Sequence, residues 1–276
     1  MILKVLAVVC VLGGIVIGLI SLEKYVKKTF PNGKETIELE LADVPLWVSD
    51  GLKEKVYTIA TGRAGNLKLD EDTASSVQRN IEELIPWLDE VKVITTHDRL
   101  RVEGRWRKPV ALIKSGMIKF YIDAEQAVLD YIPMPNLPIV EVNGLPTVTK
   151  IPPLGEVWPH DDLAAAITIL DRLSQMDRTL TPDKPLLNEI DRIDVSNFNG
   201  RENSHHAHII LYTKDNTEII WGAEVGKWQL HLESTDEQKL AKLYSHYNEF
   251  GTLSGGVKYI NLRDPRHNIP LPIDKY

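Results

Sequence analysis

Apolar and polar residues recur at regular spacings along this chain, and each spacing predicts an element. The first is a run without charged side chains from Val5 to Leu22, bounded by Lys4 and Glu23. A helix of about 20 apolar residues spans the hydrocarbon core of a bilayer, so we expect a transmembrane helix over residues 5–22. A cleaved signal peptide is the alternative, but the run is longer than a usual signal core and no small-residue cleavage pattern succeeds it.

The next part of the chain predicts a small α+β unit. Residues 36–41 alternate like a half-buried strand. One helix is expected from about Ser49, where the side chain of Ser49 or Asp50 can cap it, and a second ends before Pro86. Strands at 91–95 and 100–103 complete the order strand, helix, helix, strand, strand, with the helices on one face of the sheet. The helical faces are marked by apolar residues three and four positions apart: Leu52, Val56, Ile59 and Ala60, then Ala74, Val77, Ile81, Leu84 and Ile85.

The remaining chain predicts a β-rich domain bearing two helices. The first helix is expected to open at Asp161 or Asp162. Strands are expected next at 190–195, 207–213 and 217–221, and the polar turn between the last two predicts a hairpin. The apolar face of the helix is formed by Leu163, Ile167, Leu170 and Leu173.

The last two elements are a helix and a short strand. Thr235 and Gln238 have the spacing of a capping box, and Gly251 ends the helix. The strand at 257–262 precedes a proline-containing tail, so it is a candidate edge of the sheet, open to a partner strand. An interior strand, buried on both sides, is the alternative that the sequence leaves open. Its alternation would place Val257, Tyr259 and Asn261 on one face and Lys258, Ile260 and Leu262 on the other.

Composition narrows the range of partners. The 276 residues carry a formal charge of −7, which disfavours nucleic acid or an anionic lipid surface as the main partner. Cys10, the single cysteine, lies in the apolar run, so a disulfide in the rest of the chain is excluded. Lysines are more frequent after the apolar run than before it, which by itself favours a cytoplasmic location for the residues beyond the run.

The candidate chemistry is limited to a histidine cluster. His205, His206 and His208 are close in sequence, and the last two would share a face of a strand. Two imidazoles can begin a zinc site, which His160, Asp161 or Asp162 would complete, and the alternative is a polar loop that leads into an exposed strand edge. No spacing fixes a third ligand, and no nucleophile or phosphate-loop motif is present. We therefore expect no enzyme activity, no catalytic residue, no metal and no cofactor.

Short motifs in the second half resemble one family. Arg107-Lys108-Pro109-Val110-Ala111 is similar to the segment that joins the POTRA domain to the β domain in the bacterial cell-division proteins FtsQ and DivIB. Further similarities are Phe120 to Asp123 with Val128-Leu129, Leu137 to Val140 with Gly144, and Tyr259-Ile260-Asn261-Leu262-Arg263 near the end. Trp106, Gln126 and Asn261 differ from the residues usual in that family.

The resemblance implies an architecture and a role. The expected fold class is α+β: a single N-terminal transmembrane helix, a POTRA-like domain and a β-rich domain with two helices. The expected ranges are a cytoplasmic tail (1–4), the transmembrane helix (5–22), a linker (23–35), the POTRA-like domain (36–106), the β domain (107–265) and a C-terminal tail (266–276). A hinge between the two domains is expected at Arg107 to Pro109.

The implied function is a non-catalytic scaffold for septum formation. Such a protein lies in the cytoplasmic membrane as a single-pass protein with its N-terminus inside and its domains external, at the division septum. It binds small single-span partners of the FtsL and FtsB/DivIC types. The residues expected to bind the partner are Tyr259, Ile260, Asn261, Leu262 and Arg263. The alternatives are a POTRA-containing transport or assembly component and a histidine-dependent metal hydrolase.

Overall fold

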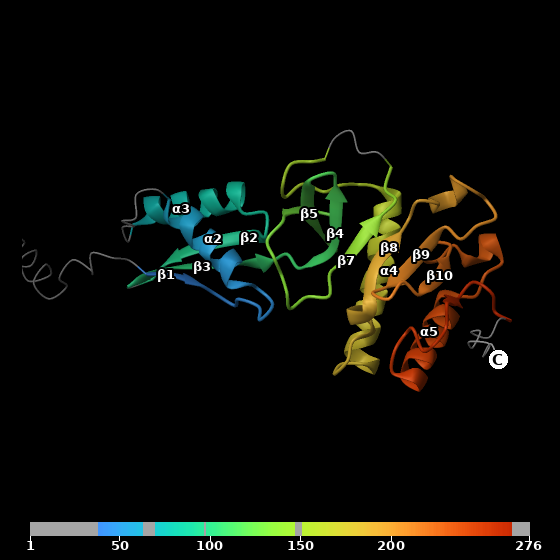
Figure 1. Ribbon diagram of the computed structural model, residues 1–276. Helices are drawn as coiled ribbons and strands as arrows, with labels where there is room; N and C mark the ends of the chain where they lie inside the picture. The colour runs from blue at the N-terminus through green and yellow to red at the C-terminus, as the bar shows by residue number, and fades with distance from the viewer. Residues whose placement is uncertain (1–37, 63–69, 97, 147–150, 267–276) are drawn as a thin grey trace, which may run out of the picture.

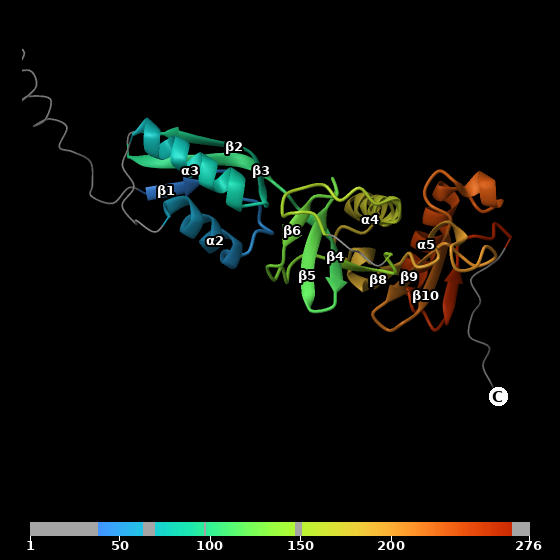
Figure 2. The ribbon, with the colours of Figure 1, turned by 90° about the horizontal axis from the view of Figure 1, so that it is seen from above.

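The computed structural model describes residues 38–62, 70–96, 98–146 and 151–266 as an α+β fold with two sheets (Figures 1 and 2). The first sheet has three strands in the order β1-β3-β2, and the second has eight in the order β11-β10-β9-β8-β7-β4-β5-β6. The elements are β1 (Glu38–Leu41), α2 (Asp50–Thr61), α3 (Glu71–Leu84), β2 (Leu88–Thr95), β3 (Arg99–Trp106), β4 (Pro109–Ser115), β5 (Ile118–Asp123), β6 (Val128–Asp130), β7 (Val140–Asn143), α4 (Asp161–Leu180), β8 (Ile190–Asp194), β9 (Ile209–Thr213), β10 (Glu218–Gly222), α5 (Asp236–Phe250) and β11 (Tyr259–Asn261).

The N-terminal unit has the element order that the sequence predicts. The Ser49 hydroxyl accepts a hydrogen bond from Leu52 N and opens α2, and Asp70 caps α3 in the same way. Both helices lie on one face of the three-stranded sheet (Figures 1 and 2). Leu84, expected on the buried face, is 56% exposed, whereas Ile85 just beyond the helix is buried. The helix ends there because Pro86 disfavours helical backbone at the residue before it.

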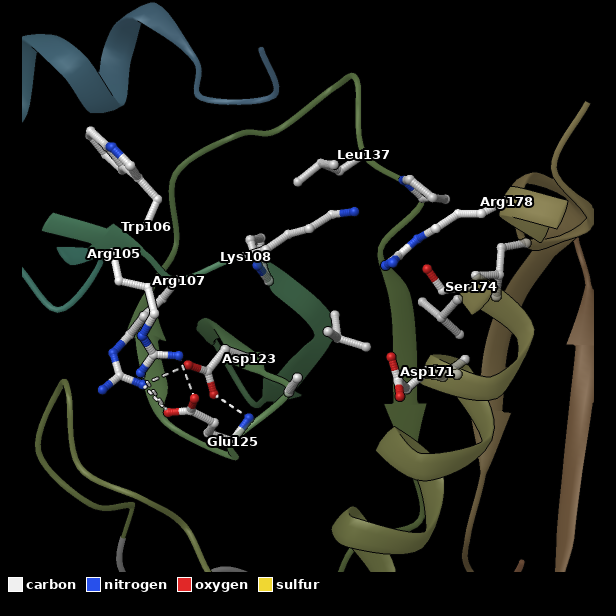
Figure 3. A pocket seen from close by; sticks show the side chains of 17 residues that line it. Arg105, Trp106, Arg107, Lys108, Asp123, Glu125, Leu137, Asp171, Ser174 and Arg178 are labelled. Carbon is white, nitrogen blue, oxygen red and sulfur yellow. Dashed lines mark hydrogen bonds and ion pairs between the residues drawn. The ribbon is translucent and has the colours of Figure 1, made fainter. Parts of the chain in front are cut away.

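The two units share a packed junction. Trp87, which directly precedes β2 in the first unit, is fully buried and meets Tyr121 of β5 edge to face, with ring centroids 6.0 Å apart. Its indole N–H donates to Asp130 Oδ1 over 2.9 Å. Arg107 lies at the expected hinge and donates to Asp89 of β2 and Asp123 of β5 over 2.9 and 2.8 Å. Figure 3 shows the Arg107 guanidinium directed at Asp123.

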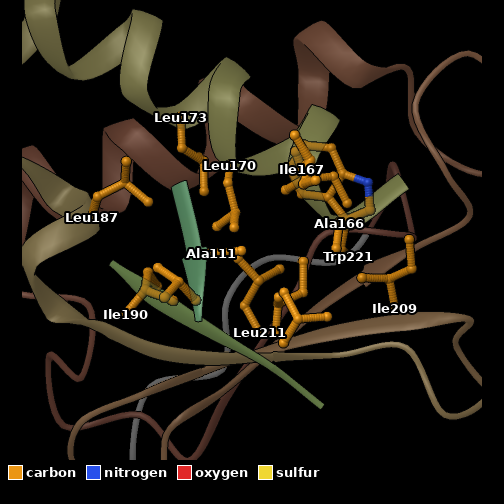
Figure 4. Close-up of a cluster of buried hydrophobic side chains, with 14 of the residues drawn as sticks. Ala111, Ala166, Ile167, Leu170, Leu173, Leu187, Ile190, Ile209, Leu211 and Trp221 are labelled. Atoms are coloured by element: carbon orange, nitrogen blue, oxygen red, sulfur yellow. The ribbon is translucent and has the colours of Figure 1, made fainter. Parts of the chain in front are cut away.

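The eight-stranded sheet carries α4 and α5 on one face. Figure 4 shows side chains of α4 packed over strand residues of this sheet. The two helices are joined by Tyr244 of α5, whose hydroxyl donates to Leu173 O and to Asp177 Oδ1 over 2.9 and 2.8 Å. One continuous core results, which includes Ala111, Leu170, Leu173, Ile193, Leu211, Ile219, Trp221, Leu243 and Ile260.

The predicted hairpin and capping box are confirmed, and two expected boundaries are corrected. Strands β9 and β10 pair in antiparallel fashion, and Thr235 and Gln238 form a reciprocal capping box for α5. The residue preceding α4 is His160, which makes no capping hydrogen bond through its side chain. Asp162 instead pairs with Arg201 over 3.1 Å. The final strand is β11, with three residues, rather than the whole of 257–262.

The expected fold class is wrong in including a membrane-spanning helix as part of the folded architecture. Within the described residues, no helix is long and apolar enough to cross a membrane. The longest, α4, has 20 residues, but acidic and basic side chains occur along its length. A spanning helix needs about that length of predominantly apolar sequence. Residues 5–22, where the helix was expected, lie outside the described residues.

Candidate partner-binding edge

Strand β11 forms one end of the eight-stranded sheet. It pairs in parallel with β10, with Tyr259 opposite Glu218 and Asn261 opposite Ile220. The sequence left an edge and an interior position open and the resemblance favoured the edge, which is the position that β11 has. An outer strand is bonded on one side only, so its other side can pair with an added strand.

The register shows which main-chain groups face outward. Glu218 N donates to Lys258 O, and Leu262 N donates to Ile220 O over 3.0 Å. In a parallel ladder alternate residues direct their main-chain groups to the same neighbour. Residues 258, 260 and 262 therefore face β10, while Tyr259 and Asn261 direct their N–H and C=O groups away from it. Within the part of the chain that the structure describes, these two residues supply the open edge of the sheet.

Part of this edge is covered by a lysine of α5. Lys242 Nζ donates to the outward carbonyl oxygen of Asn261 over 2.6 Å. The Asn261 side chain in turn accepts from Arg263 N over 3.0 Å and ends the strand. Burial lowers the pKa of the Lys242 amine, and the nearby Asp264 carboxylate partly opposes this. A partner strand that reaches Asn261 O must displace the lysine.

The side chains of the sheet near this edge form two rows. The buried row is formed by Ile193, Leu211, Ile219 and Ile260, which are successive neighbours across four strands. The opposite face carries Arg192, Tyr212, Glu218 and Tyr259 in the same register. Tyr259 is 38% exposed and is the last member of that row. A strand added to β11 would extend both rows.

An ion-pair cluster holds the residue that comes two positions after the strand. Glu233 accepts from the fully buried Lys239 amine and from Arg263 Nε, each over 2.7 Å. Burial raises the pKa of Glu233, but the hydrogen bonds from Lys239, Ala223 N and Arg263 outweigh it, so the pKa lies below the usual value. A Cβ on Gly222 would lie 2.2 Å from the Glu233 carboxylate, so glycine is required there.

The structure divides the five expected binding residues into separate roles. Tyr259 and Asn261 provide the outward main-chain groups. Ile260 and Leu262 are completely buried in the core and offer no side-chain surface to a partner. Arg263 is partly buried against Glu233. Sequence reasoning missed Lys242, Glu233 and Lys239, because their approach to the strand depends on how α5 packs, and no local spacing encodes it.

The histidine cluster does not form a metal site in the described residues. His205 and His206 are exposed and precede β9, whereas His208 is buried and stacks edge-on against His231 at 4.6 Å. The premise that His206 and His208 share a strand face is therefore wrong. Within residues 38–62, 70–96, 98–146 and 151–266, no three His, Cys, Asp or Glu side chains gather as metal ligands.

Comparison with known proteins assigns the chain to no family. No family model matches the chain, and no curated protein is similar to it.

Proposed function

We propose that this chain is a non-catalytic scaffold of the bacterial division machinery that binds a partner by strand addition to β11. The observation that carries the proposal is the position of β11 as an outer strand whose Tyr259 and Asn261 main-chain groups face away from the sheet. Main-chain hydrogen bonds to such an edge give affinity, and alternate side chains give specificity.

The division role rests on the motif resemblance to FtsQ and DivIB proteins. The order β1-α2-α3-β2-β3, with the eight-stranded sheet after it, supports this role, because the family pairs a POTRA domain with a β domain. The proposed partners are single-span proteins of the FtsB/DivIC and FtsL types. The N-terminal unit would serve recruitment to the septum, and the eight-stranded sheet would serve partner capture outside the cytoplasmic membrane.

The chemistry at the edge indicates how a partner strand is oriented. Glu218 and Tyr259 are neighbours in the exposed row, so a cationic or aromatic partner side chain fits beside Tyr259. A partner carboxylate would be attracted to Arg263, which fixes register more than it adds affinity.

The test is a proline substitution at the edge. Tyr259→Pro removes an outward donor and blocks an added strand, but it leaves the β10 ladder intact because residue 259 faces away from β10. We expect affinity for an FtsB/DivIC-type partner to fall about tenfold or more by calorimetry. Ile260→Pro is unsuitable, since the Ile260 side chain is in the core.

Tyr259→Thr is the matched control, because it changes the side chain and keeps the amide. It should retain most of the affinity, and all variants should keep the wild-type circular dichroism spectrum. Equal affinity for folded Tyr259→Pro and wild type would refute strand addition.

A further inference from the structure

A cavity of about 290 Å³ lies beside the junction of the two units. It is bounded by the end of β3, the start of β4, the segment before β7 and one face of α4. Figure 3 shows its side chains converging from these elements. This cavity is remote in sequence from β11 and shares no lining residue with the partner-binding edge.

Apart from Asp171 of α4, which accepts a hydrogen bond from Gln175, the charged groups at the cavity form two sets. Arg105 and Arg107 are neutralised: Arg105 donates to Glu125 Oε2 over 3.0 Å, and Arg107 donates to Asp123 Oδ2 over 2.8 Å. These pairs belong to the junction between the two units. The two arginines and the two carboxylates together contribute no net charge to the cavity.

Lys108 and Arg178 form the second set. Across the cavity their side chains point toward each other (Figure 3). Among the described residues, neither takes part in an ion pair or a hydrogen bond to a carboxylate. Burial of the amine and the nearby Arg178 guanidinium both lower the pKa of Lys108. Two cations that face each other, neither of them paired with a carboxylate of the described residues, favour the entry of an anion.

The rest of the wall is mainly apolar. The apolar lining side chains come from four separate segments and are Val110, Leu137, Pro138, Val140, Leu170 and Leu187. Ser174 adds a hydroxyl on the α4 side. Ligand sites typically combine such apolar walls with a few convergent polar groups.

We propose that this cavity binds a carboxylate carried on an apolar body, with Lys108 and Arg178 holding the carboxylate. The cavity wall carries four cations and three carboxylates, Asp171 included, so its net formal charge is +1. This matches a singly charged carboxylate better than a doubly charged phosphate. Arg178 supplies the fork that pairs with a carboxylate, and Lys108 supplies a point charge.

The experiment is a calorimetric titration of the full-length protein with hexanoate, and with hexanamide as the uncharged probe. Hexanoate should bind in about the millimolar range, as expected for a ligand of this size, and hexanamide should not bind detectably. Lys108→Met and Arg178→Met should each weaken hexanoate binding about tenfold, the loss of one charge-assisted contact.

Arg172→Met is the control, because Arg172 is on the same helix as Arg178 but does not line the cavity. It should bind hexanoate like the wild type. Arg178 is exposed on α4, so its replacement tests the site even if Lys108→Met fails to fold.

Two probes identify the source of the carboxylate. The dipeptide acetyl-Gly-Leu with a free carboxyl end is compared with its amide and with hexanoate. Tighter binding of the dipeptide acid indicates a peptide terminus as ligand, and tighter binding of hexanoate indicates a small acid. Absence of binding by both acids, or unchanged binding in both Lys108→Met and Arg178→Met, would overturn the proposal.

Discussion

Among single residues, the most constrained charge is Lys239, whose side chain is completely buried and held by Glu233. Its amine also lies 5.5 Å from the centre of the Trp221 ring. A buried cation of this kind depends on its carboxylate, because removing one partner leaves an uncompensated charge. Glu233 thus connects the folding of α5 to the position of Arg263.

The first residue-scale prediction is that Glu233→Gln lowers the free energy of unfolding by about 3–5 kcal/mol at pH 7. Urea unfolding monitored by circular dichroism measures this loss. Glu249→Gln, an exposed change on α5, should cost less than about 0.5 kcal/mol. Similar stabilities for the two variants would show that the buried pair is dispensable.

The pH dependence of stability depends on the same carboxylate. The pKa of Glu233 is lower in the folded protein than in the unfolded chain, where it is about 4.3. Its contribution is therefore complete above the unfolded pKa and is lost as the pH falls through the folded pKa. Unfolding measured from pH 7 to pH 3 should show this loss in the wild type and a shallower decline in Glu233→Gln.

At the scale of elements, β11 is short and one of its two outward carbonyls is occupied. Lys242 donates to Asn261 O and so competes with a partner strand. We predict that Lys242→Met tightens partner binding about three- to tenfold, because the added strand no longer displaces a hydrogen bond. Calorimetric titration of wild type and Lys242→Met with the FtsB/DivIC-type partner measures this change in affinity. Weaker binding in this variant would mean that the lysine contacts the partner.

At the scale of the whole molecule, the junction joins the two units through Asp130. Its carboxylate accepts from Trp87 Nε1 and from Lys55 Nζ over 2.9 and 2.8 Å. The buried cluster of the first unit also includes Tyr121, Leu129 and Met134 from beyond the connection. The expected hinge at Arg107 to Pro109 is thus spanned by packing and ion pairs, so the two units should move together.

The junction prediction uses Asp130→Ala. Loss of the acceptor leaves the buried Trp87 N–H without a partner, and we expect a loss of about 1–3 kcal/mol in stability. Asp50→Ala removes an exposed pair with Lys53 and should cost less than about 1 kcal/mol. Thermal unfolding of the two variants and the wild type measures these losses of stability. If Asp130→Ala is as stable as the control, the hydrogen bond between Trp87 and Asp130 does not contribute to the stability of the protein.

Location in the cell tests the proposed division role. A fluorescent fusion should gather at the septum of dividing cells. A uniform ring around the cell periphery would instead favour a transport or assembly component.

Most of the local structure could be predicted from the amino-acid sequence. Strand and helix periodicity, the Ser49 and Thr235 caps and the Pro86 and Gly251 stops depend on neighbouring residues, so they are encoded within a few positions. The prolines after β11 made it a candidate edge strand, but they did not decide between the edge and the interior of the sheet. The order of elements in both units is a consequence of these local signals.

Tertiary packing determines which side of β11 is open and which residues lie against it. The register with β10 sends Ile260 and Leu262 into the core, and the packing of α5 brings Lys242 and Glu233 to the strand. Likewise, Lys108 and Arg178 face each other only because β4 and α4 meet. Such contacts join residues far apart in sequence, and their geometry depends on packing that no local pattern specifies.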